Sequence, residues 1–83
     1  MEFNITFRNL EHTPALDQRI REKSEKLSKH LKDAATIHWT CWTEANDQIA
    51  EAKLDNGKDH YFAKAHTDDL YKTIDEVIKK LEN

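Results

Sequence analysis

Apolar residues in this 83-residue chain recur with two different periods, and the order of those periods restricts the fold more than any single residue does. Four stretches alternate apolar and polar side chains, as half-buried strands do, and two carry apolar residues at helical spacing. We therefore expect an α+β fold of β-α-β-β-β-α order, with a four-stranded mixed sheet and both helices on one face. A chain of this length has room for one modest core, so residues 1–83 are expected to form a single domain.

The four alternating stretches lie near residues 2–7, 36–44, 50–55 and 59–66. A helix joins the first two, which are therefore expected to be parallel, and the others should form antiparallel hairpins. The last stretch is expected to turn Tyr61, Ala63 and Ala65 toward the core. Asp55-Asn56-Gly57-Lys58 predicts a tight turn, because Asn-Gly readily adopts positive φ.

The two helical stretches have recognisable starts. Thr13-Pro14 predicts the start of the first helix, with threonine as the N-cap and proline at the first helical position. Its apolar stripe has a gap where Lys23 and Ser24 fall. Thr67 or Asp68 is expected to cap the second helix. The apolar residues of that helix are Leu70, Ile74, Val77, Ile78 and Leu81.

The net charge of −3 argues against a nucleic-acid partner, but the charges are unevenly distributed. Residues 17–32 have a balance of +3 and residues 33–67 one of −3. A basic face can therefore exist on an acidic protein. Basic residues step along the first helix at intervals of three or four: Arg19, Lys23, Lys26, Lys29 and His30. From charge spacing alone, the better explanation is a solvated face with Glu22–Lys26 and Glu25–Lys29 ion pairs.

No pattern of catalytic or metal-binding residues is present, so we expect a protein that is not an enzyme and needs no cofactor or metal. The five histidines and Cys41 have none of the short spacings of zinc sites. Cys41 alternates with apolar residues, which predicts a buried, inert thiol. A single cysteine suits a reducing cytoplasm, and neither a signal peptide nor a membrane-spanning segment is expected.

Two aromatic residues, Trp42 and Phe62, fall on the outward face of the predicted sheet. They could stack on bases or dock a protein partner. The simpler interpretation is a cross-strand pair that stiffens the sheet. A protein-interaction module that uses this face is therefore our alternative function.

Several motifs together resemble the hibernation promoting factor and ribosome-associated inhibitor A family, also called the sigma-54 modulation family. Thr13-Pro14-Ala15-Leu16 opens the first helix, and Lys23, Lys26 and Leu27 match a Lys-x-x-Lys-Leu pattern. The most specific motif is Asp69-Leu70-Tyr71-x-x-Ile74-Asp75, followed by Ile78, Lys80 and Leu81. The resemblance covers essentially the whole chain and implies a fold similar to the double-stranded-RNA-binding domain.

The resemblance also implies a partner and a mode of action. Members dock on ribosomal RNA of the small subunit, in the channel for messenger and transfer RNA, and inhibit translation under stress. Lys23, Lys26 and Lys80 match motif positions and are the main candidates for phosphate contacts. Arg19, Lys29 and Lys79 lie nearby and are weaker candidates. We expect Tyr71 and Asp75 to orient the two helices. No membrane and no small-molecule substrate is expected.

Three features depart from the family pattern. The chain stops at Asn83, where short relatives continue with a lysine-rich tail, so we expect a short form without that basic tail. Residues 68–83 are net acidic, and Ser24 replaces an apolar or aromatic residue. A general binder of duplex RNA is disfavoured, because Thr67-Asp68-Asp69 is acidic where such a domain needs positive charge.

Overall fold

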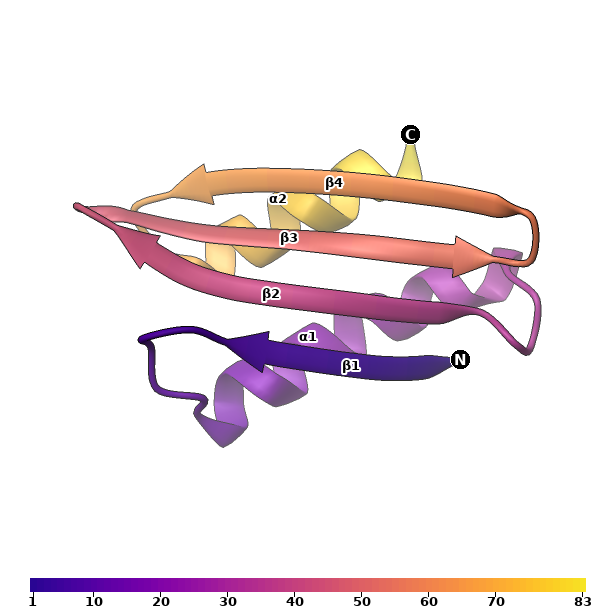
Figure 1. Ribbon diagram of the computed structural model, residues 1–83, viewed down its shortest axis with the longest axis horizontal. Helices are drawn as coiled ribbons and strands as arrows, with labels where there is room; N and C mark the ends of the chain where they lie inside the picture. Colours follow the sequence, from indigo (N-terminus) through magenta and orange to yellow (C-terminus); the bar gives the residue numbers. More distant parts are fainter.

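The computed structural model describes all 83 residues, and its elements follow the order that the hydrophobic periods predict (Figure 1). The strands are β1 (Glu2–Phe7), β2 (Thr36–Glu44), β3 (Asp47–Asn56) and β4 (Asp59–Thr67). The helices are α1 (Pro14–Leu27), the short 3-10 helix η1 (Ser28–His30) and α2 (Leu70–Glu82).

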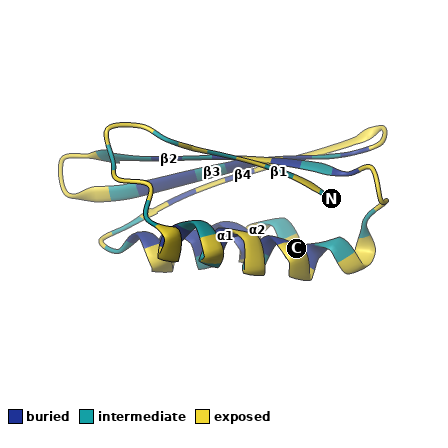
Figure 2. Ribbon diagram, turned by 90° about the horizontal axis from the view of Figure 1, so that it is seen from below, coloured by how far each residue is buried: buried dark blue, intermediate teal, exposed yellow.

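The sheet has the order β1-β2-β3-β4, with β1 parallel to β2 and the other pairs antiparallel. Both helices lie side by side on one face, and the other face is open (Figure 2). The expected four-stranded mixed sheet with two helices on one face is therefore confirmed. This arrangement leaves β1 and β4 as edge strands and brings α1 and α2 together, although they are far apart in the sequence.

The core lies between the sheet and the helices and is built around Trp39, which is 1% exposed. Small residues on the inner face of β3 and β4, such as Ala52 and Ala63, let the helices approach the sheet. The indole Nε1 of Trp39 donates a hydrogen bond to Ser24 Oγ over 3.0 Å, and Ser24 is fully buried. Ser24, which interrupts the apolar stripe of α1, therefore supplies the one hydrogen-bond acceptor that the Trp39 indole needs inside the core.

The hairpin between β3 and β4 turns one residue later than Asn-Gly chemistry predicts. Asn56 is still paired with Asp59, so Gly57 and Lys58 form the turn, and Gly57 takes the positive φ of 69°. The side chain of Asn56 is instead used elsewhere, because its Oδ1 accepts a hydrogen bond from the backbone N–H of Lys32 over 2.8 Å.

The start of α2 also differs from the prediction, since neither Thr67 nor Asp68 is the N-cap. Asp69 caps the helix by accepting a hydrogen bond from the backbone N–H of Tyr71 over 3.0 Å. The hydroxyl of Thr67 is occupied by Thr73 of the helix, at 2.7 Å, and by the backbone of Asp69. Both threonine and aspartate can cap a helix, so tertiary contacts decide between them here.

One residue expected in the core is largely outside it. Tyr61 lies on the helix side of β4 but is 47% exposed, because it borders a groove at the end of the helices and β4 is the edge of the sheet. The expectation that Tyr61 is buried with Ala63 and Ala65 was therefore wrong for the tyrosine, while both alanines are buried.

Candidate nucleic-acid interface

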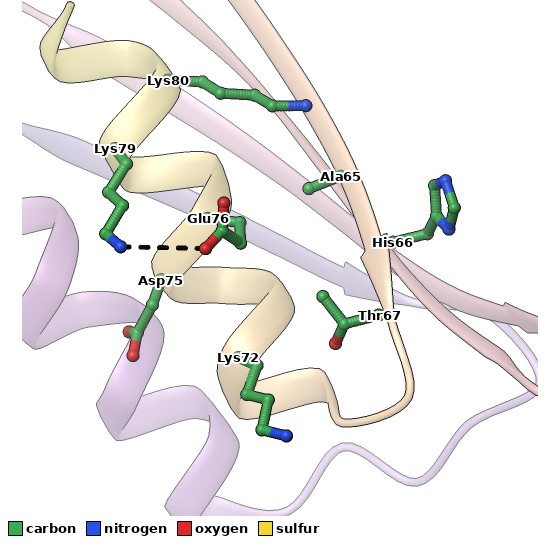
Figure 3. A pocket seen from close by; sticks show the side chains of 8 residues that line it. All are labelled: Ala65, His66, Thr67, Lys72, Asp75, Glu76, Lys79 and Lys80. Carbon is green, nitrogen blue, oxygen red and sulfur yellow. Dashed lines mark ion pairs between the residues drawn. The ribbon is translucent and has the colours of Figure 1, made fainter.

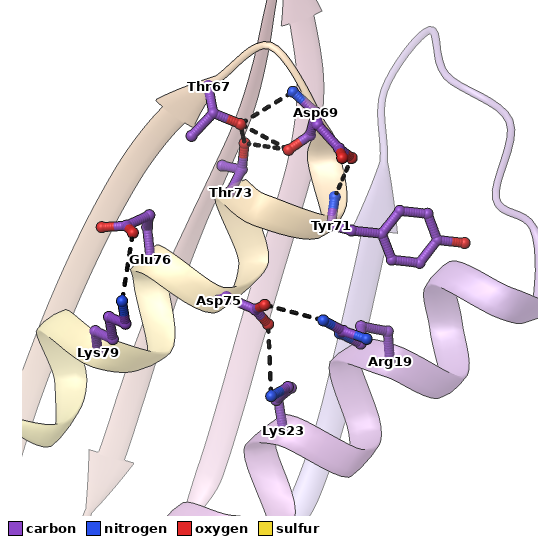
Figure 4. A network of polar contacts seen from close by, with 9 residues as sticks. All are labelled: Arg19, Lys23, Thr67, Asp69, Tyr71, Thr73, Asp75, Glu76 and Lys79. Atoms are coloured by element: carbon purple, nitrogen blue, oxygen red, sulfur yellow. Dashed lines mark hydrogen bonds and ion pairs between the residues drawn. The ribbon is translucent and has the colours of Figure 1, made fainter.

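Asp75 of α2 joins two cations of α1 and so ties the helices together (Figure 4). Its Oδ2 accepts a hydrogen bond from Arg19 Nη2 over 2.9 Å, and its Oδ1 lies 3.7 Å from Lys23 Nζ. The Arg19 guanidinium also lies over the Tyr71 ring, with 5.8 Å between its carbon and the ring centroid. The four residues Arg19, Lys23, Tyr71 and Asp75 thus form one network between α1 and α2, which we call the helix clamp.

The charge state of the clamp follows from these contacts. Burial disfavours the carboxylate of Asp75, but the hydrogen bond from Arg19 and the charges of Arg19 and Lys23 prevail and lower its pKa. The same hydrogen bond and charge raise the pKa of Arg19. At neutral pH the clamp therefore carries two cations and one anion. Arg19 Nε and Asp75 Oδ1 are enclosed without a hydrogen-bond partner of their own.

Lys26 of α1 and Lys29 of η1 carry charges that have no acidic partner. Both are exposed, and neither has an acidic group within 4.0 Å. The expected ion pairs Glu22–Lys26 and Glu25–Lys29 do not form, since Glu22 instead accepts a hydrogen bond from Gln18 over 2.7 Å. The explanation of the basic stripe as a salt-bridged surface was therefore wrong for these two lysines.

A groove of about 240 Å³ runs between α1 and α2 and collects charged residues from both. Lys23 and Lys26 come from α1 and Lys79 from α2, with Asp75 and Glu82 between them. On α2 the lining residues are Asp75, Ile78, Lys79 and Glu82, which lie on one helical face. The sequence did not identify Ile78 and Glu82 as residues of this groove, although their spacing of three and seven residues from Asp75 places them on the same helical face. We call this feature the inter-helix groove.

Lys80 lies apart from the lysines of α1. Its Nζ donates a hydrogen bond to the backbone carbonyl of Lys64 in β4 over 2.6 Å. It lines a second hollow of about 460 Å³ on the other side of α2, with Lys72, His66 and Glu76 (Figure 3). Lys79 reaches both hollows and lies 3.8 Å from Glu76 Oε1. The predicted phosphate contacts are therefore not on one surface: Lys23, Lys26 and Lys79 share a groove, whereas Lys80 does not.

Trp42 and Phe62 both face away from the helices, but they do not pair. Strand β3 lies between them. Trp42 is in register with Ile49 of β3 and, across β3, with His66 of β4, which is four residues along β4 from Phe62. That offset is about 13 Å along the strand, with two strand spacings of roughly 5 Å across the sheet. The expected cross-strand pair is therefore wrong. Trp42 instead lies opposite Ile49, which is 5% exposed, and the Lys64 ammonium lies 5.2 Å from the Trp42 ring centroid.

The groups that could support other chemistry are dispersed or shielded. Cys41 is buried, and burial raises the pKa of its thiol to about 12, so the thiolate is essentially absent at neutral pH. No three His, Cys, Asp or Glu side chains converge as metal ligands do. No helix is long and apolar enough to cross a bilayer.

A family model described as sigma 54 modulation protein / S30EA ribosomal protein matches residues 3–83. The chain belongs to this family. It is 33% identical over 82 residues to ribosome-associated factor Y of Haemophilus influenzae, and the alignment covers 99% of this chain and 77% of that protein. It is also 33% identical over 81 residues to the ribosome hibernation promoting factor of Klebsiella oxytoca, covering 98% of the chain and 85% of the relative.

Two solved structures share the fold of this chain. The N-terminal domain of Thermus thermophilus Protein Y superposes with a TM-score of 0.92 at 23% identity, over 99% of this chain and 92% of that one. A ribosomal subunit interface protein from Coxiella burnetii superposes with a TM-score of 0.87 at 24% identity, over 99% and 90%. Both likenesses show that this chain has the same β-α-β-β-β-α fold as these two structures.

Proposed function

We propose that the chain is a cytoplasmic, non-enzymatic hibernation factor that binds the small ribosomal subunit and inhibits translation. The interface is the face formed by α1 and α2, and ribosomal RNA is the partner. The observation that carries the proposal is the inter-helix groove, where Lys23, Lys26 and Lys79 converge from two helices. Relatives of the family are named as ribosome-associated and ribosome hibernation factors, which agrees with this partner.

The groove suits recognition of an RNA backbone rather than a sequence. Lysine ammonium groups are compact point charges that contact phosphates from many angles, so they position RNA by shape. The helix clamp holds Lys23 at the groove, while Lys26 and Lys29 have no competing carboxylate. Binding of this kind occupies the RNA surface sterically and weakens as salt rises.

The proposal is tested by charge reversal on α1. Lys23→Glu with Lys26→Glu should abolish co-sedimentation with purified small subunits at low salt and relieve inhibition of a cell-free translation reaction. The matched control is Lys53→Glu with Lys64→Glu, which makes the same charge change on the outward face of the sheet. Equal binding by the two double variants would refute docking through the helix face.

The alternative, a protein-interaction module on the outward face, has less support. Trp42 and Phe62 do not form one patch, and Trp42 is occupied by Lys64 and by Glu44, whose carboxylate accepts its indole hydrogen bond over 3.1 Å. Trp42→Ala would distinguish the two functions. Loss of a protein partner with unchanged subunit binding would favour the module.

A further inference from the structure

A second groove continues the inter-helix groove toward the ends of α1 and α2, and its chemistry is different. It encloses about 390 Å³ and shares Lys26 and Glu82 with the inter-helix groove, so the two are continuous. Five of its ten lining residues are apolar and form its floor, and these come from α1, the segment after η1, the sheet and α2. The floor residues are Leu27, Leu31, Leu54, Tyr61 and Leu81. We call this part the apolar groove.

Tyr61 is the unusual member of this floor. Its side chain is 47% exposed although it lies on the helix side of the sheet, in register with the buried Leu54. An aromatic ring that is half exposed beside leucines offers a flat surface for another planar ring. Its neighbour Phe62 is 56% exposed but points to the opposite face of the sheet, so the two rings are separate surfaces.

The charges around the apolar groove determine which part of a ligand fits it. Helices α1 and α2 both end here, and the C-terminal end of a helix carries partial negative charge. Glu82 adds a carboxylate at the same end. Lys26 lines both grooves and His30 lines the apolar one, so a phosphate is favoured where the two grooves join, beside Lys26 and the neighbouring Lys23. A neutral ring that donates hydrogen bonds suits the position near Glu82.

We infer that the channel accommodates one unstacked nucleotide of the bound RNA, with its base against Tyr61 and Leu81 and its flanking phosphates beside Lys23 and Lys26. The exocyclic amino groups of adenine, cytosine and guanine can donate hydrogen bonds to the Glu82 carboxylate, whereas uracil has no exocyclic amino group and offers only its ring N3–H. Unpaired bases that stack on aromatic side chains are the usual basis of single-strand recognition. This inference rests on the proposed function and adds the feature of the RNA that the chain selects.

The test compares Tyr61→Ala, Tyr61→Phe and the control Phe62→Ala in binding to purified small ribosomal subunits over a range of salt concentrations. Loss of one base stack should weaken binding by Tyr61→Ala about 5- to 150-fold at every salt concentration. The slope of log affinity against log salt should stay that of the parent, because no phosphate contact is removed. Tyr61→Phe and Phe62→Ala should bind within twofold of the parent.

The outcomes separate this inference from the function on which it rests. If the parent does not bind subunits, the proposed function fails. If the parent binds and Tyr61→Ala equals Phe62→Ala, only the base-binding groove fails. A photo-cross-linking phenylalanine derivative in place of Tyr61 then identifies the neighbour directly. An adduct with ribosomal RNA supports the inference, and an adduct only with a ribosomal protein overturns it.

Discussion

Removing the charge of Lys26 alone should change the salt dependence of subunit binding by the amount that corresponds to one phosphate contact. Lys26 is exposed, lines the inter-helix groove and has no acidic partner, so its whole charge is available to RNA. One lysine–phosphate contact contributes about 0.7–0.9 to the slope of log affinity against log salt. Lys26→Gln should therefore lower the magnitude of this slope by about 0.8.

This change has a measurable size. Between 50 and 200 mM salt, a slope difference of about 0.8 corresponds to about a threefold difference in affinity loss. The parent should thus lose about three times more affinity than Lys26→Gln over this range. Sedimentation or fluorescence anisotropy with labelled protein at several salt concentrations gives both slopes from the same subunit preparation.

Lys53→Gln is the matched control, because Lys53 is also exposed and without an ion pair but lies on the outward face of β3. Its slope should equal that of the parent. If Lys26→Gln kept the parent's slope, Lys26 would not contact a phosphate. If Lys53→Gln lowered the slope as much as Lys26→Gln, net charge rather than the helix face would control binding.

Three further predictions concern groups whose surroundings the structure defines. Ser24→Ala leaves the buried indole N–H of Trp39 without an acceptor and should cost about 1–3 kcal/mol, or about 4–8 °C in Tm per kcal/mol, in thermal unfolding. In a Trp39→Phe background, which has no indole N–H, the same Ser24→Ala change should cost less. Cys41 should resist a thiol reagent at pH 8 in the native state and react fully in denaturant, because burial raises its pKa to about 12. The pKa of Asp75 is lowered below its ordinary value of 3.8, so the ionised carboxylate stabilises the fold above that pH and this contribution is lost as pH falls through the native pKa. In urea unfolding, Asp75→Asn should therefore lose less stability than the parent does when the pH is lowered below about 4.

The order of elements could be predicted from the sequence because each element carries its own period. Alternation identifies a strand and helical spacing identifies a helix without knowledge of the rest of the chain. The topology then follows from short connections and a right-handed crossover. The local pattern did not determine which of several neighbouring residues forms a turn or caps a helix, as at the Gly57–Lys58 turn and the Asp69 N-cap.

The contacts of the candidate site depend on pairs that are distant in sequence. Asp75 meets Arg19 across 56 positions, and Trp39 meets Ser24 across 15. No periodicity within one helix reveals such partners, because they depend on the relative position of the two helices and the sheet. The separation of Trp42 from Phe62 has the same origin, since it follows from the register of three strands together.

The position of Asp75 explains how an acidic chain can present a cationic groove. Two cations held close together on α1 would repel each other, and the carboxylate between them offsets this repulsion in the free protein. The same carboxylate reduces the charge that Arg19 and Lys23 offer to a phosphate. The proposed binding of RNA should then depend more on the unpaired Lys26 and Lys29, while the helix clamp fixes the separation of α1 and α2. On this argument Lys26→Gln weakens binding more than Lys23→Gln, and Asp75→Asn changes the width of the inter-helix groove as well as its charge.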